Sequence, residues 1–177
     1  ALPGIDKVKL AVEQCKRLQH AGIPVYAIAG SHDYSPTGKT MLEVLGKAGM
    51  LDIASRAHMQ DGKLLLDPIE DPKTKALIAG IPGRKGMLDR QYYELLDRDV
   101  QQSQSKPFSI FLFHTTLTEL KPKGMEQMES SPESMLPEHH NYYAAGHVHV
   151  RMSKPYSDGI IVYPGPLFPC SVKEMEE

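Results

Sequence analysis

The chain has no tryptophan, only two cysteines in 177 residues and no excess of basic residues. Cys15 and Cys170 form no C-x-x-C pair, so the sequence indicates neither a disulfide framework nor a thiolate zinc site, and we expect a reducing, cytoplasmic compartment. The 20 basic and 22 acidic residues leave a net charge of -2, which argues against non-specific DNA binding by charge alone. No apolar run approaches the ~20 residues of a membrane-spanning helix, so we expect no membrane association.

The length and the 41% hydrophobic content fit one globular domain. Apolar residues at helical spacing predict a helix over 5–20, which Gly22 ends, and a second over 40–47 with Ser35 or Thr37 as its cap. Continuous apolar runs and the Asp61-Gly62 turn predict strands at 23–30, 52–59, 63–66, 75–81, 108–113, 142–146 and 160–163, with a short connection over 151–159. A polar helix over 88–102 and a long irregular stretch over 121–138 complete an α/β fold, in which mixed β-sheets are flanked by helices.

Three of these strands run straight into histidine. The residues at the strand ends are Ser31, His32 and Asp33, then His114, then His147 and His149. Functional sites in open α/β sheets are built beyond the carboxyl ends of the strands, and neutral imidazole is a good ligand for zinc, manganese and iron. Residues two apart in extended backbone point to the same side, so His147 and His149 are expected to face one pocket. The set predicts a metal site.

Two other interpretations compete with the metal site. Each histidine taken alone fits an ordinary solvated loop residue. Ser31, His32 and Asp33 contain the residue types of a catalytic triad, but contiguous residues cannot place hydroxyl, base and orienting acid in line, and the sequence has no G-x-S-x-G elbow.

The strand-end motifs resemble a known family. Gly30-Ser31-His32-Asp33, Phe113-His114 and Gly146-His147-Val148-His149 resemble, in this order, the last three motifs of the calcineurin-like metallophosphoesterases. Around them, GIPVYAIAGSHDYSPTGKT, FLFHTTLTEL, NYYAAGHVHVR and IVYPGPLFP resemble the archaeal and bacterial SbcD-type nucleases, the meiotic-recombination-eleven family of DNA double-strand-break repair. The resemblance covers residues 5–168 and implies a four-layer αββα domain.

The resemblance implies a metal-dependent nuclease that uses two divalent metal ions, with Mn²⁺ the expected metal. His114 and His147 would bind the second ion and His149 the first. His32 would assist the departure of the leaving group, and Asp33 would orient His32. Ser31 stands where the family usually has a metal-binding asparagine, and a hydroxyl is a shorter and weaker ligand than an amide carbonyl.

The family also has D-x-H and G-D motifs, which hold the first ion and bridge both, and neither precedes residue 23. We therefore expect residues 1–177 to be a partial, incomplete domain that lacks the first two strands and the later capping domain. Three imidazoles can hold one ion but not two. The isolated chain is expected to show little or no activity.

The implied partners are DNA ends, an SbcC-type ABC ATPase and a second copy in a homodimer. The candidate phosphate contacts are Arg84, Lys85, Lys121, Lys123, Arg151 and Lys154. Two other functions remain open at this point: a small-molecule phosphodiesterase or phosphatase of the same superfamily, and a non-catalytic dimerising fragment.

Overall fold

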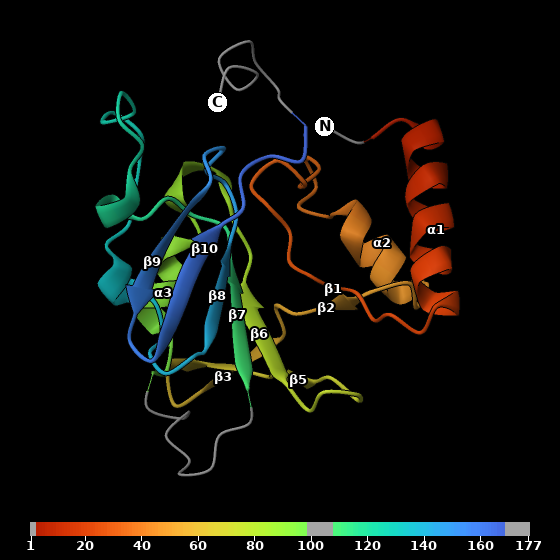
Figure 1. The fold of residues 1–177 in the computed structure, drawn as a ribbon, viewed down its shortest axis with the longest axis horizontal. Coiled ribbons are helices and arrows are strands. Elements are labelled where there is room, and N and C mark those ends of the chain that lie inside the picture. The colour runs from red at the N-terminus through yellow and green to blue at the C-terminus, as the bar shows by residue number, and fades with distance from the viewer. Residues whose placement is uncertain (1–2, 99–107, 169–177) are drawn as a thin grey trace.

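The computed structural model describes residues 3–98 and 108–168 (Figure 1). Its helices are α1 (Ile5–His20), α2 (Met41–Lys47), α3 (Arg90–Leu95) and the 3-10 turns η1 (Lys85–Met87), η2 (Thr118–Leu120) and η3 (Glu133–Met135). Its strands are β1 (Tyr26–Ala27), β2 (Asp52–Ile53), β3 (Ala57–Gln60), β4 (Lys63–Leu66), β5 (Ile69–Glu70), β6 (Leu77–Ile81), β7 (Ser109–Phe113), β8 (Tyr142–Ala145), β9 (Met152–Tyr156) and β10 (Gly159–Tyr163). The predicted α/β class with a mixed sheet is confirmed.

One six-stranded sheet organises the molecule, in the order β5-β6-β7-β8-β10-β9. Its four central strands are parallel, and antiparallel β5 and β9 border them. Ile81, Phe113 and Ala145 end β6, β7 and β8 in register with one another. The residues that follow these three strands therefore emerge side by side at one edge of the sheet.

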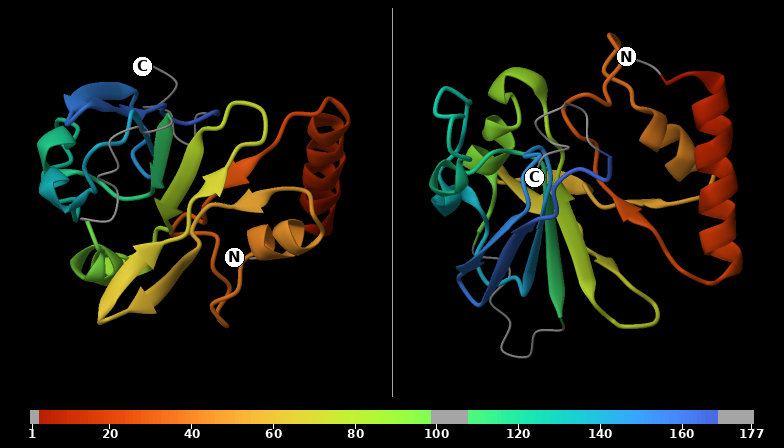
Figure 2. Two further views of the ribbon diagram at one scale, coloured as in Figure 1. Left: turned by 90° about the horizontal axis from the view of Figure 1, so that it is seen from below. Right: turned by 45° about the horizontal axis from the view of Figure 1, so that its top comes forward.

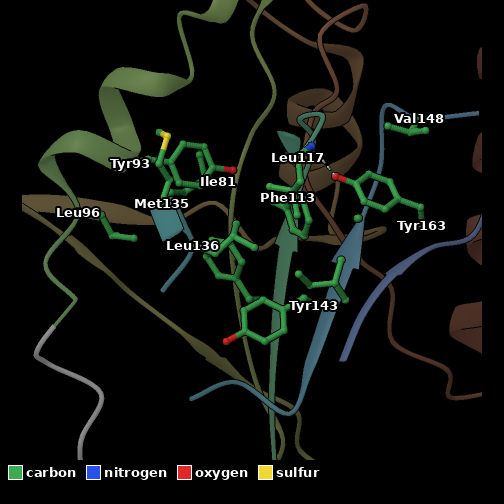
Figure 3. Packing of buried hydrophobic residues seen from close by; sticks show 13 residues of the cluster. Ile81, Tyr93, Leu96, Phe113, Leu117, Met135, Leu136, Tyr143, Val148 and Tyr163 are labelled. Carbon is green, nitrogen blue, oxygen red and sulfur yellow. Dashed lines mark hydrogen bonds between the residues drawn. The ribbon is translucent and has the colours of Figure 1, made fainter. Parts of the chain in front are cut away.

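Side chains alternate along the strands, and one face of the sheet carries the core (Figure 3). Phe111, Phe113 and Tyr143 are at most 1% exposed and pack with Tyr93 of α3 and with the segment around η3. The hydroxyl of Tyr163 donates to the carbonyl of Thr115 at 2.7 Å and accepts from the N–H of Leu117 at 3.2 Å. These bonds fix the chain that leaves β7 against β10.

The opposite face of the sheet is also apolar but is less well covered. Ile110, Leu112, Tyr142 and Ala144 point to this side and are half-buried. They line two cavities of about 330 and 240 Å³ that lie between the sheet and β1. This face therefore has space in which a further apolar segment could pack against the sheet.

The predicted helix over 5–20 is confirmed as α1, whose end is followed by Gly22 with φ of 66°. None of its residues is fully buried. The cap of α2 is Thr40, whose hydroxyl accepts from the N–H of Glu43 at 3.1 Å, so the predicted caps Ser35 and Thr37 were wrong. Figures 1 and 2 show α1 and α2 together on one side, next to the β1–β2 pair.

Four other predictions differ from the structure. The stretch 52–59 holds two short strands, β2 and the start of β3, which belong to different sheets. Only Tyr26–Ala27 of the stretch 23–30 forms a strand, and it pairs with β2 in a separate sheet. The connection over 151–159 contains strand β9, because the hairpin turn allows it to pair with β10. Of the predicted helix over 88–102, Arg90–Leu95 is helical, and 99–102 lies outside the described residues. In the described part of the chain, no helix combines the length and apolar character needed to cross a membrane.

Candidate metal-binding cavity at the strand ends

A cavity of about 450 Å³ lies beyond the carboxyl ends of the parallel strands, and four of the six predicted site residues line it. These are Ser31, His32, His114 and His147. Asp33 and His149 are not part of the cavity wall. The tertiary structure thus brings three separate strand-end segments to one hollow.

His114 occupies the centre of this arrangement because three backbone segments approach its ring. A Cβ added to Gly30, Gly83 or Gly146 would lie 2.8, 2.6 and 2.7 Å from an imidazole atom of His114. Such distances are far below van der Waals contact, so only glycine allows the three segments to close around the ring. The imidazole is therefore held in place by the backbone.

His147 faces His114, with 5.1 Å between the ring centroids. Its φ of 83° lies in the left-handed region, which is strained for a residue with a Cβ. Strand β8 has already ended at Ala145, so the expected two-residue alternation does not apply to His147 and His149. His149 is exposed, while Val148 between them is buried in the core.

Burial keeps both facing imidazoles neutral. The pKa of His114 is lowered to about 4, chiefly by burial, with the neighbouring His147 adding to the shift and Asp33 opposing it. Burial also lowers the pKa of His147, and the charge of Asp89 counteracts this. Both rings are thus in the form that binds metal ions near neutral pH.

The low pKa of His114 predicts acid destabilisation. Between pH 6.5 and about 4 the unfolded chain binds a proton on His114 that the folded chain does not, so the free energy of unfolding falls as the pH falls. With allowance for partial solvent screening, we expect a loss of about 2–3 kcal/mol over this window. Urea denaturation at several pH values measures it. The His114→Asn variant should show a flatter pH dependence, and an unchanged dependence would contradict the prediction.

The segment after β1 supplies a hydroxyl, an imidazole and a carboxylate in different surroundings. Ser31 is 5% exposed, and its Oγ has no hydrogen-bond partner among the described residues. His32 is exposed at the cavity. The carboxylate of Asp33 accepts from the N–H of Gly30 at 2.7 Å, and no hydrogen bond within 3–98 and 108–168 joins it to His32.

Sequence reasoning missed a buried carboxylate in the cavity wall. Asp89 is 4% exposed and lies close enough to His147 for the two charges to interact. Burial raises the pKa of Asp89, whereas hydrogen bonds from backbone N–H groups, including that of Arg84, and from Thr115 lower it. Asp89 follows a loop and not an apolar strand, so no local pattern singles it out. The one available hint was Thr115, a polar residue directly after His114, since its side chain bonds Asp89.

The donors of the cavity fit a divalent cation in part. Two neutral imidazoles and an unpartnered hydroxyl converge, which suits one ion. Among the described residues, however, no group of three or more His, Cys, Asp or Glu side chains is placed to hold a metal ion. The described residues therefore present an incomplete set of metal ligands. A centre with two metal ions would need further ligand groups beside these three.

The fold and the cavity define an α/β chain with a histidine-lined hollow at the carboxyl ends of parallel strands. No family model matches it. Its sequence is 26% identical over 183 aligned positions to the DNA double-strand break repair protein Mre11 of Methanococcus maripaludis, covering 99% of this chain and 45% of that protein. It is 30% identical over 154 positions to the DNA double-strand break repair protein Mre11 of Sulfurisphaera tokodaii, covering 86% of this chain and 36% of that protein.

A third relative, the Mre11 protein of Methanocaldococcus jannaschii, is 25% identical over 164 positions, with 92% of this chain and 41% of that protein covered. The chain is thus a distant homologue of archaeal Mre11 DNA double-strand break repair proteins over most of its length. The resemblance drawn from the motifs is confirmed. The chain spans less than half the length of these curated relatives.

Proposed function

We propose that this chain carries the histidine half of the active site of a metal-dependent DNA nuclease that acts in double-strand break repair. The observation that carries the proposal is the convergence of His114 and His147 with the unpartnered Ser31 hydroxyl in one cavity. The distant homology to Mre11 repair proteins supports DNA as the substrate.

The residues take distinct roles in this proposal. His114, His147 and Ser31 contribute ligands to one divalent ion, Mn²⁺ being expected, and His149 contributes to the other. Bound metal ions in such sites supply a hydroxide nucleophile and neutralise phosphate oxygens. His32, exposed at the cavity, donates a proton to the departing alkoxide, while Asp33 fixes the preceding turn through its bond to Gly30.

The remaining ligands have to come from groups outside this cavity. The half-covered apolar face around Leu112 and Tyr142 supports a domain in which two further strands pack between the sheet and β1. Those strands would bring carboxylates to the same edge. An ABC ATPase and a second copy of the chain are the proposed protein partners.

The test is cleavage of end-labelled duplex DNA in MnCl₂, with nitrophenyl phosphate esters as competing substrates. We expect the protein produced from its own gene to cleave DNA and to lose this activity with EDTA. The 177-residue chain alone should bind at most about one Mn²⁺ and cleave little. Hydrolysis of the nitrophenyl esters without DNA cleavage would instead support a small-molecule phosphoesterase.

A non-catalytic role is favoured by one observation, the absence of a three-ligand metal cluster from the described residues. Intact mass combined with elemental analysis separates it from the nuclease. A protein with no bound manganese, iron or zinc and no cleavage after metal is added would support the non-catalytic fragment.

A further inference from the structure

Two basic residues at the rim of the cavity are not neutralised by acidic partners. Arg84 and Lys85 line the cavity beside His32, and neither forms an ion pair within residues 3–98 and 108–168. Two of the other candidate phosphate contacts are engaged elsewhere: Lys154 bonds Glu133, and Lys121 donates to the carbonyl of Glu126 at 3.0 Å. The remaining two, Lys123 and Arg151, are not part of the cavity wall.

The guanidinium of Arg84 is held over an aromatic ring. Its Cζ lies 4.3 Å from the ring centroid of Tyr34, which follows the Ser31-His32-Asp33 segment. Tyr34 is half-buried and its backbone forms an isolated bridge with Thr40, so its ring offers a fixed platform. A guanidinium that stacks on a ring keeps its in-plane N–H donors available for a planar, bidentate contact with two oxygens.

A second observation indicates a polar ligand in the same cavity. The Oγ of Ser31 is buried and unpartnered among the described residues, which is costly unless a ligand or water bonds to it. The Ser31 hydroxyl, which the proposed function assigns to a metal ion, does not by itself select an anion, and the lining also holds the carboxylates of Asp89 and Glu129. The guanidinium of Arg84 and the ammonium of Lys85 form no ion pair with these carboxylates among the described residues, and they favour an anion with several oxygens. The phosphodiester group of a nucleic acid strand has this chemistry.

We propose that Arg84 contacts the phosphate backbone of the bound strand next to the histidines, and that Tyr34 is the positioning residue that holds Arg84 there. This inference rests on the proposed function, since it takes DNA as the ligand. The contact carries no sequence information and sets the register of the strand over the cavity.

The experiment measures fluorescence anisotropy of a labelled duplex of roughly 20 base pairs in EDTA, over a range of salt concentrations. Arg84→Gln should raise Kd about 5–10-fold and reduce the salt slope by about 1. Tyr34→Leu should raise Kd about 3-fold, whereas Tyr34→Phe keeps the ring and should stay close to wild type. Arg17→Gln, an exposed arginine of α1 bonded to Gln14, is the matched control and should have no effect.

The outcomes separate the two levels of the proposal. Wild-type affinity and salt slope in Arg84→Gln would overturn the role of this pair while leaving the nuclease proposal standing. Equal losses in Tyr34→Leu and Tyr34→Phe would overturn the role of the ring and assign it to the Tyr34 hydroxyl, which also interacts with Arg84. No measurable DNA binding by the wild-type protein would overturn both. Far-ultraviolet circular dichroism of each variant shows that a loss does not come from unfolding, since Arg84→Gln keeps the backbone N–H that bonds Asp89.

Discussion

His147→Asn is expected to lower manganese-dependent DNA cleavage by at least about 100-fold, because the substitution removes one of two facing imidazoles from the cavity. Asparagine is suited to this position because it tolerates positive φ better than most residues, so the backbone at 83° should be retained. The measurements are cleavage of end-labelled duplex by the protein produced from its own gene, and Mn²⁺ binding by titration calorimetry.

The chain contains a closely matched control for this variant. His139 is also a histidine with positive φ, 67°, but its Nδ1 pairs with Asp158 at 2.7 Å and it is not part of the cavity wall. His139→Asn thus makes the same chemical change at a residue that also has a left-handed backbone, and it should leave DNA cleavage unaltered. Equal activity of the two variants would remove His147 from the proposed site.

Phe111→Ala should lower the free energy of unfolding by about 3–5 kcal/mol. The side chain is 0% exposed, and its ring centroid lies 5.3 Å from that of His140 and 6.3 Å from that of Tyr143. Truncation leaves a cavity in the middle of the core face, which the rigid strands on either side cannot close. Denaturation in urea measures the loss.

Phe108→Ala is the control for the core variant. Phe108 directly precedes β7 and is 55% exposed, so the same truncation should cost less than about 1 kcal/mol. Similar losses in the two variants would mean that the core face of the sheet is not the one described.

The sequence predicted the strands and helices whose pattern is local. The apolar runs that became β6, β7, β8 and β10 are continuous because both faces of the parallel strands are apolar, and the helical spacing over 5–20 gave α1. Strand β9 was missed because Met152–Tyr156 is an edge strand with exposed polar residues and a proline, so it has no apolar run.

The candidate site was predictable only in part. His114 and His147 were placed together because each follows a buried strand, and parallel neighbours end at the same edge. Asp89 escaped notice because a loop brings it to the cavity, and loop positions carry no periodic signal. Arg84 was among the predicted phosphate contacts, but its place in the cavity wall depends on the tertiary structure. His149 lies outside the cavity wall, although its charge reaches His147, and strand periodicity does not predict the left-handed backbone at His147.

The sequence by itself determined the α/β class, the parallel core strands and the histidines at their ends, because burial and periodicity act on neighbouring residues. Only the tertiary structure decided which of those histidines meet, how three glycines close around His114, and that Tyr34 holds Arg84 at the rim. These contacts join residues tens of positions apart. The register of the sheet and the approach of its loops set them, and neither is encoded in any single segment.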